Sequence, residues 1–249
     1  MLNISFLPEH IITIGSFAIT NSLLISWIAM AILIIFAYFA TRKMRTVPSG
    51  LQNFAEVIIE ALYNLIEGVT GNDKQTKKFF PVVATIFLLV LLANWLGLIP
   101  GVGSIGIWEE GHKGEEILVP LFRSTSADLN FTLALAIVSV GAAQIFGVAA
   151  LGVFKYGKKF INFKNPILFF VGILELIGET AKMVSFSFRL FGNIFAGEVL
   201  LLVISFLVPY VVPLPFYFLE VIVGVIQAFI FAMLTLVFLK MAVTPHEEH

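Results

Sequence analysis

Six ionisable side chains lie within long apolar segments of the C-terminal part of the chain, and they define the chemistry that the protein could perform. They are Glu175, Glu179, Lys182, Arg189, Glu198 and Glu220. The guanidinium of Arg189 stays protonated at any relevant pH, and placing it at bilayer depth costs roughly 2.5–3.5 kcal/mol on insertion scales. Two interpretations offset this cost. Arg189 could form a structural ion pair with one of the glutamates at 175, 179 and 198, or it could be a fixed cation on a route for ions.

Helical geometry separates these side chains into faces. At about 100° per residue, one face of a helix carries Lys182, Ser185, Arg189 and Asn193, with Glu175 near it. Glu198 follows Arg189 by nine residues, which places it on the opposite face and about 13.5 Å further along the axis. A direct ion pair between Arg189 and Glu198 within one helix is therefore not expected.

The final apolar segment adds Glu220 and Gln227, which are seven residues apart and project the same way. Glu198 and Glu220 on facing helices would form a pair of carboxyl groups that exchanges a proton with water. Glu220 could instead bond to backbone near a helix start, because Pro215 is only five residues away. Gln227 could bind the guanidinium across the two helices or form a generic interhelical hydrogen bond.

The elements that position these residues must lie in a membrane. The chain has 249 residues, of which 59% are apolar, only 12% are charged and 26 are phenylalanines. This composition predicts an all-α, polytopic membrane protein. There is no cysteine, so disulfides and thiolate metal sites are excluded. The net charge of −1 gives no bulk attraction to nucleic acid.

Hydropathy and helix-boundary signals predict a single membrane domain over residues 1–249. Its expected parts are a first span at 22–40, an interfacial amphipathic helix at 51–67, spans at 81–99 and 129–154, and two long segments at 166–208 and 216–243. We expect Pro81 to open the second span. The 42 residues between Pro166 and Pro209 would extend about 63 Å as a helix, whereas a hydrocarbon core is about 30 Å thick. The last two segments should therefore form a steeply tilted hairpin.

Basic residues predict the orientation. Ten of the fifteen lysines and arginines lie in 42–78 and 155–164, which we expect on the cytoplasmic side. The N-terminus and the acid-rich loop 101–128 are then external, and the tail that ends in His249 is cytoplasmic. The first fifteen residues have no signal-peptide pattern, so the first span should serve as the targeting signal.

Several motifs carry a resemblance to a known family. They are Arg189-Leu-Phe-Gly-Asn193, Ala196-Gly-Glu198, Gln227-Ala-Phe-Ile230, Ala93-Asn-Trp-Leu-Gly-Leu-Ile-Pro100 and Ala127-Asp-Leu-Asn-Phe-Thr-Leu-Ala-Leu-Ala136. With these, the chain past residue 20 closely resembles subunit a of F-type ATP synthases. The resemblance implies a proton-conducting stator with two offset aqueous half-channels against a rotating ring of c subunits.

The resemblance also implies residue roles and partners. Arg189 would be the essential arginine that faces the ring, with Asn193 beside it and Gln227 packed against it. Glu198, together with Glu220, would form the external inlet, and the path to the cytoplasm would be lined by Glu175, Lys182 and Ser185. The expected partners are the c-subunit ring, the peripheral-stalk b subunits, the remaining ATP synthase subunits and the lipid of a bacterial plasma (inner) membrane. No cofactor, metal or nucleotide site is implied.

The inlet departs from a common bacterial pattern. Many relatives carry a histidine where Glu220 stands, and mitochondrial forms often combine a glutamate there with a histidine that matches Gly197. This chain has neither histidine, so its inlet would contain two carboxyl groups and no imidazole.

Two other functions compete with this one. A secondary transporter could use Arg189 as an anion site, although no internal repeat supports such a fold. A cytochrome b-like electron carrier needs paired histidines within its spans. The four histidines lie outside the expected spans, at His10, His112, His246 and His249.

Overall fold

A computed structural model of the chain describes residues 10–14, 17–99, 106–110, 116–120, 123–160 and 166–244. The predictions for His112, Lys164 and the tail 245–249 fall outside these residues. Five described helices are long and apolar enough to cross a membrane, which confirms the all-α polytopic fold. They are α1 (Asn21–Thr41), α3 (Asp73–Gly97), α4 (Leu129–Leu151), α6 (Pro166–Leu207) and α7 (Pro213–Val243).

Helix α3 starts earlier than expected, and the prediction that Pro81 opens this helix is wrong. The helix begins at Asp73, and the side chain of Asn72 caps it by accepting a hydrogen bond of 2.9 Å from the backbone N–H of Lys74. Pro81 lies inside the helix, where it removes one backbone donor. The two turns before it are retained because Thr76 and Phe79 are buried there.

Helix α4 ends at Leu151, and a short additional helix, α5 (Val153–Phe160), follows it. The expected span extended to residue 154 without a break. Gly152 separates the two helices with a φ of +83°, a conformation that glycine adopts without steric cost. The chain folds back here, and the buried ring of Tyr156 lies so close to Gly147 that a side chain at position 147 would collide with it.

The predicted amphipathic helix is α2 (Leu51–Thr70), which links α1 to α3. Its Tyr63 packs against Phe80 of α3, with 5.6 Å between ring centroids, and its Phe54 packs against Phe36 of α1 at 6.1 Å. Half of its apolar side chains are exposed, including Leu51. The predicted place of α2 at the membrane surface remains an expectation.

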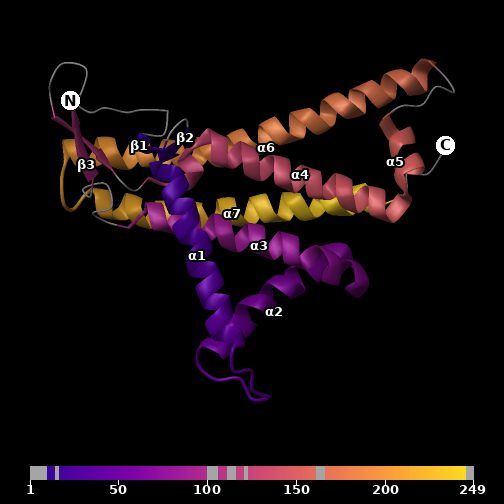
Figure 1. Cartoon of the computed structure of the whole chain (residues 1–249), viewed down its shortest axis with the longest axis horizontal. Coiled ribbons are helices and arrows are strands. Elements are labelled where there is room, and N and C mark those ends of the chain that lie inside the picture. The colour runs from indigo at the N-terminus through magenta and orange to yellow at the C-terminus, as the bar shows by residue number, and fades with distance from the viewer. Residues whose placement is uncertain are drawn as a thin grey trace.

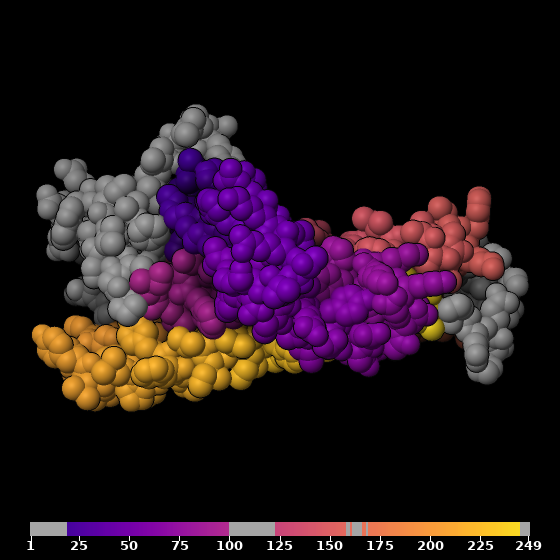
Figure 2. All heavy atoms as spheres, turned by 90° about the horizontal axis from the view of Figure 1, so that it is seen from below, coloured from indigo at the N-terminus to yellow at the C-terminus, as the bar shows by residue number. Residues whose placement is uncertain are grey.

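Helices α3, α4, α6 and α7 lie side by side along the long axis of the molecule, and α1 crosses them (Figure 1). Seen from below, α7 forms one edge, and α1, α2 and α3 cover much of the face toward the viewer (Figure 2). Phe186 of α6 and Phe231 of α7 stack in the core with 3.7 Å between ring centroids. The long hairpin of α6 and α7 is thus packed as one unit with α4, and its tilt in the membrane remains an expectation.

Two small antiparallel hairpins accompany the helices and were not expected from the sequence. One joins β1 (His10–Ile14) to β2 (Phe17–Thr20), and the other joins β3 (Gly106–Glu110) to β4 (Glu116–Pro120). The pair β3–β4 lies toward the end of the molecule where α6 passes into α7 (Figure 1). A short 3-10 helix, η2 (Thr125–Ala127), then leads into α4.

Candidate functional site

Arg189 lies on an uncovered face of α6. Its side chain is exposed, as are those of Ser185 and Asn193 on the same face. On the neighbouring face of the helix, Phe186 and Leu190 are buried in the core. Since apolar residues on one side of α6 anchor the helix, the polar stripe that carries Arg189 is held facing outward.

The guanidinium of Arg189 forms no hydrogen bond or ion pair with any residue that the structure describes. Two of the glutamates that could have neutralised it contact other cations. Glu179 accepts from the ammonium of Lys182 at 2.9 Å, and Glu198 lies 3.4 Å from Nε of Arg123. The structural ion pair with Glu179 or Glu198 is therefore absent from the described part of the chain.

A hollow of about 320 Å³ lies beside Arg189. Lys182 and Ser185 line it from α6, and Leu234 and Phe238 line it from α7. The ammonium of Lys182 lies 5.6 Å from the centroid of the Phe238 ring, a cation–π contact. The structure therefore brings Lys182, Ser185 and Arg189 together, whereas Glu175 is not among the residues that line this hollow.

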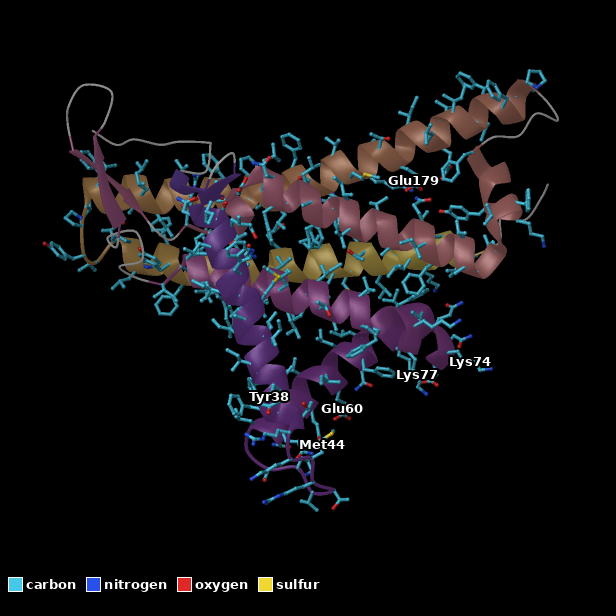
Figure 3. The ribbon with its side chains drawn as sticks, in the orientation of Figure 1. Tyr38, Met44, Glu60, Lys74, Lys77 and Glu179 are labelled. Carbon is cyan, nitrogen blue, oxygen red and sulfur yellow. The ribbon has the colours of Figure 1, made fainter. Side chains whose placement is uncertain are left out.

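A hydrogen-bond network from three helices holds Glu179 and Lys182. The hydroxyl of Tyr156 in α5 donates to Gln144 of α4 at 2.6 Å, and Gln144 donates to Glu179 of α6 at 3.1 Å. Figure 3 shows Glu179 on the side of α6 turned toward α4 and α5. Burial, with the charges of Glu179 and Glu175, raises the pKa of Tyr156 to about 12, so its hydroxyl stays neutral and keeps donating.

A second, larger cavity of about 410 Å³ contains Glu198 and Glu220. It is bounded by α3, α6, α7 and the segment before η2, and it shares no lining residue with the hollow beside Arg189. Glu220 is only 5% exposed. Its carboxyl lies against Gly197, where a Cβ atom would collide with it. The two carboxyl groups that the sequence analysis paired thus border one cavity.

The polar residues of this cavity that were not predicted from the sequence include Arg123, Asn94 and Ser124. The amide nitrogen of Asn94 donates to the carbonyl of Gly224 at 3.1 Å. Its Oδ1 and the hydroxyl of Ser124 are buried without a hydrogen-bond partner in the described chain. Asn94 could have been found from the sequence, because an asparagine within an apolar span indicates a polar site. No sequence pattern indicates that Arg123 contacts α6.

The two remaining predicted site residues, Gln227 and Asn193, do not contact Arg189 by a hydrogen bond in the described structure. Gln227 of α7 is 9% exposed, and Asn193 is exposed on α6. Within the described ranges, neither is hydrogen-bonded to Arg189. A cluster of three or more histidine or acidic side chains that could hold a metal ion is also absent from the described residues.

Comparison with known proteins shows the family of the chain. Residues 23–240 match the family described as ATP synthase A chain. ATP synthase subunit a of Campylobacter jejuni subsp. jejuni serotype O:23/36 is 37% identical over 221 residues, which is 88% of each chain. The proteins of the same name from Geotalea uraniireducens and Trichlorobacter lovleyi are 34% and 33% identical, over 94% and 93% of this chain and 90% of theirs. The chain therefore belongs to the ATP synthase subunit a family.

Proposed function

We propose that the chain provides two offset half-channels for protons and that Arg189 couples proton flow to rotation of a c-subunit ring. The broader role follows from the family: the chain is an integral membrane subunit of an ATP synthase that translocates protons, and it is not an enzyme by itself. Family membership also removes the two rival functions, a secondary transporter and a cytochrome b-like carrier.

The observation that carries the proposal is an exposed arginine that has no ion-pair partner among the described residues and borders one of two separate cavities. Glu198 and Glu220 lie in one cavity, and Arg189 borders the other. Because the cavities share no lining residue, a proton that enters one would need a carrier to reach the other. A carboxyl group on a neighbouring, turning subunit would be such a carrier.

The exposed stripe of α6 fits the carrier's path. A carboxyl group that passes this stripe in its neutral form can cross lipid, and the fixed charge of Arg189 favours its ionisation on arrival. The released proton would leave past Ser185 and Lys182, with Glu175 further toward the cytoplasm. Arg189 would also repel a proton that moves directly between the cavities.

The experiment that tests proton transport uses inverted membrane vesicles carrying the whole complex. We expect addition of ATP to quench a pH-sensitive dye to the same extent with and without sodium, because the inlet offers carboxyl groups that exchange protons. An uncoupler should reverse the quench. Quenching that disappears when sodium is added, or sodium uptake in place of acidification, would contradict a proton path.

A substitution at Gly197 tests the proposed role of the inlet. Gly197→Ala should displace the carboxyl of Glu220 and lower proton-driven ATP synthesis roughly tenfold, since a misplacement of about 1 Å can cost up to 100-fold. The complex should still assemble, because the new Cβ meets the end of a flexible side chain.

Gly141→Ala on α4 is the matched control, because a Cβ at position 141 meets no atom within 4 Å. Its rate of ATP synthesis should equal that of the unmodified complex. Equal rates for Gly197→Ala and Gly141→Ala would show that the position of the Glu220 carboxyl does not limit proton entry.

A further inference from the structure

We propose that Arg123 is a positioning residue of the external cavity: it holds the carboxylate of Glu198 by an ion pair and leaves Glu220 as the carboxyl that exchanges protons. This inference rests on the proposed function, in which both glutamates belong to the inlet. It assigns different tasks to two residues of the same type.

The contact between Arg123 and Glu198 is partly shielded from solvent. Nε of Arg123 lies 3.4 Å from Oε2 of Glu198, and the two side chains are 11% and 35% exposed. The guanidinium also lies 5.8 Å from the ring centroid of Phe195, one turn before Glu198 on α6. A guanidinium with so little exposure needs a counterion, and Glu198 supplies it.

The backbone that carries Arg123 is anchored independently of this ion pair. Thr125 of η2 donates to the carbonyl of Ser22 at 3.3 Å, and the hydroxyl of Ser22 donates to Asp128 at 2.5 Å. Asp128 also caps α4 by accepting from the N–H of Asn130 at 2.9 Å. Because α1, η2 and α4 fix this segment, Arg123 can hold Glu198 in place instead of following its movements.

The other groups around the cavity leave Glu220 as the exchanging carboxyl. Among the described residues that line it, α7 contributes Glu220 and Tyr217, and α3 contributes the uncharged Asn94. Arg123 is the cation in this described lining, so one carboxylate is balanced and the second has no cationic partner there. The unpartnered oxygens of Asn94 and Ser124 offer hydrogen-bonding positions to water at the same wall.

The experiment compares Arg123→Gln and Arg123→Lys in the assembled complex, with ATP synthesis measured against the pH inside inverted vesicles. We expect Arg123→Gln to slow synthesis about tenfold and to move the pH–rate profile about one unit toward higher pH, since losing a nearby cation favours the protonated form of a carboxyl. Arg123→Lys keeps the positive charge, so it should retain most of the rate of ATP synthesis and the pH–rate profile of the unmodified complex. A purely structural role would leave the profile unmoved.

A double substitution tests whether the effect passes through Glu198. Arg123→Gln combined with Glu198→Gln should be no slower than Glu198→Gln alone, because both changes remove the same ion pair. Arg42→Gln at the exposed end of α1 is the control for loss of an arginine and should match the unmodified complex. The inference would be overturned if the double variant lost ATP synthesis by the product of the two single losses. An unshifted pH–rate profile in Arg123→Gln would also overturn it.

Different experimental results would contradict the role of Arg123 and the proposed function. An inactive Arg189→Ala complex together with an unaffected Arg123→Gln complex would remove only the role of Arg123. An active Arg189→Ala complex would remove the coupling mechanism itself. The amount of assembled complex, measured for each variant, separates loss of folding from loss of transport.

Discussion

Arg189→Ala is expected to lower proton-driven ATP synthesis by about 100-fold or more. The guanidinium is exposed on α6 and has no partner within the described chain, so its charge is available to a carboxyl group of the rotor. An opposite charge within about 4–6 Å shifts the ionisation of a carboxyl by roughly 1–3 pH units, which is a factor of roughly 10–1,000 in the ionised fraction. Without that charge, the carrier would keep its proton and would not release it toward the cytoplasm.

The measurement is ATP synthesis in vesicles energised by an imposed pH gradient and membrane potential. Arg42→Ala at the end of α1 is the control, and it should retain the unmodified rate. We also expect Arg189→Ala to let the gradient decay faster, because the repulsion between the two cavities is lost. Coupled synthesis at the normal rate in Arg189→Ala would show that this cation is not required.

The second large effect is expected from Glu198→Gln combined with Glu220→Gln. A carboxamide keeps the shape of the side chain but cannot bind and release a proton at neutral pH. Proton entry through the external cavity should therefore slow by about 10²–10³-fold, the lower half of the 10²–10⁴-fold effects of a positioned acid or base. Glu220→Gln alone should lower the rate of ATP synthesis more than Glu198→Gln alone. The reason is that Glu198 is held by Arg123, which leaves Glu220 to exchange protons.

Initial rates of ATP synthesis at several driving forces provide the measurement, because each elementary charge that crosses 100 mV supplies about 2.3 kcal/mol. Glu60→Gln on α2 is the control, because Glu60 is exposed and does not line the cavity. Figure 3 shows Glu60 on α2, away from α6 and α7. If the double variant and Glu60→Gln are equally fast, Glu198 and Glu220 do not belong to the proton path.

The amino-acid sequence by itself determined the membrane fold and the location of the charged residues. Five segments are too long and too apolar for a soluble domain, and the described residues form a membrane-length helix in each of them. The helical period also placed Ser185, Arg189 and Asn193 on one face, and all three are exposed together. These properties depend on local hydropathy and on the geometry of a single helix, both of which the order of residues specifies.

Local signals were less reliable where tertiary contacts competed with them. Pro81 predicts a helix start. However, α3 begins eight residues earlier, because Asn72 caps it and Phe79 is buried. The continuous apolar pattern at the end of α4 conceals the turn at Gly152. Before Pro81, packing of Phe79 against other helices outweighs the preference of one proline for a helix start. At Gly152, a glycine with positive φ permits the turn within an apolar stretch.

Only the tertiary structure decided which charges are paired. Arg123 is 75 residues from Glu198 in the chain and contacts it because η2 folds back onto α6. Lys182 contacts Glu179, while Arg189 has no such partner among the described residues. An ion pair depends on distances of a few ångströms between side chains that can come from different helices. Helical periodicity specifies directions within one helix, whereas these distances depend on how the helices pack together.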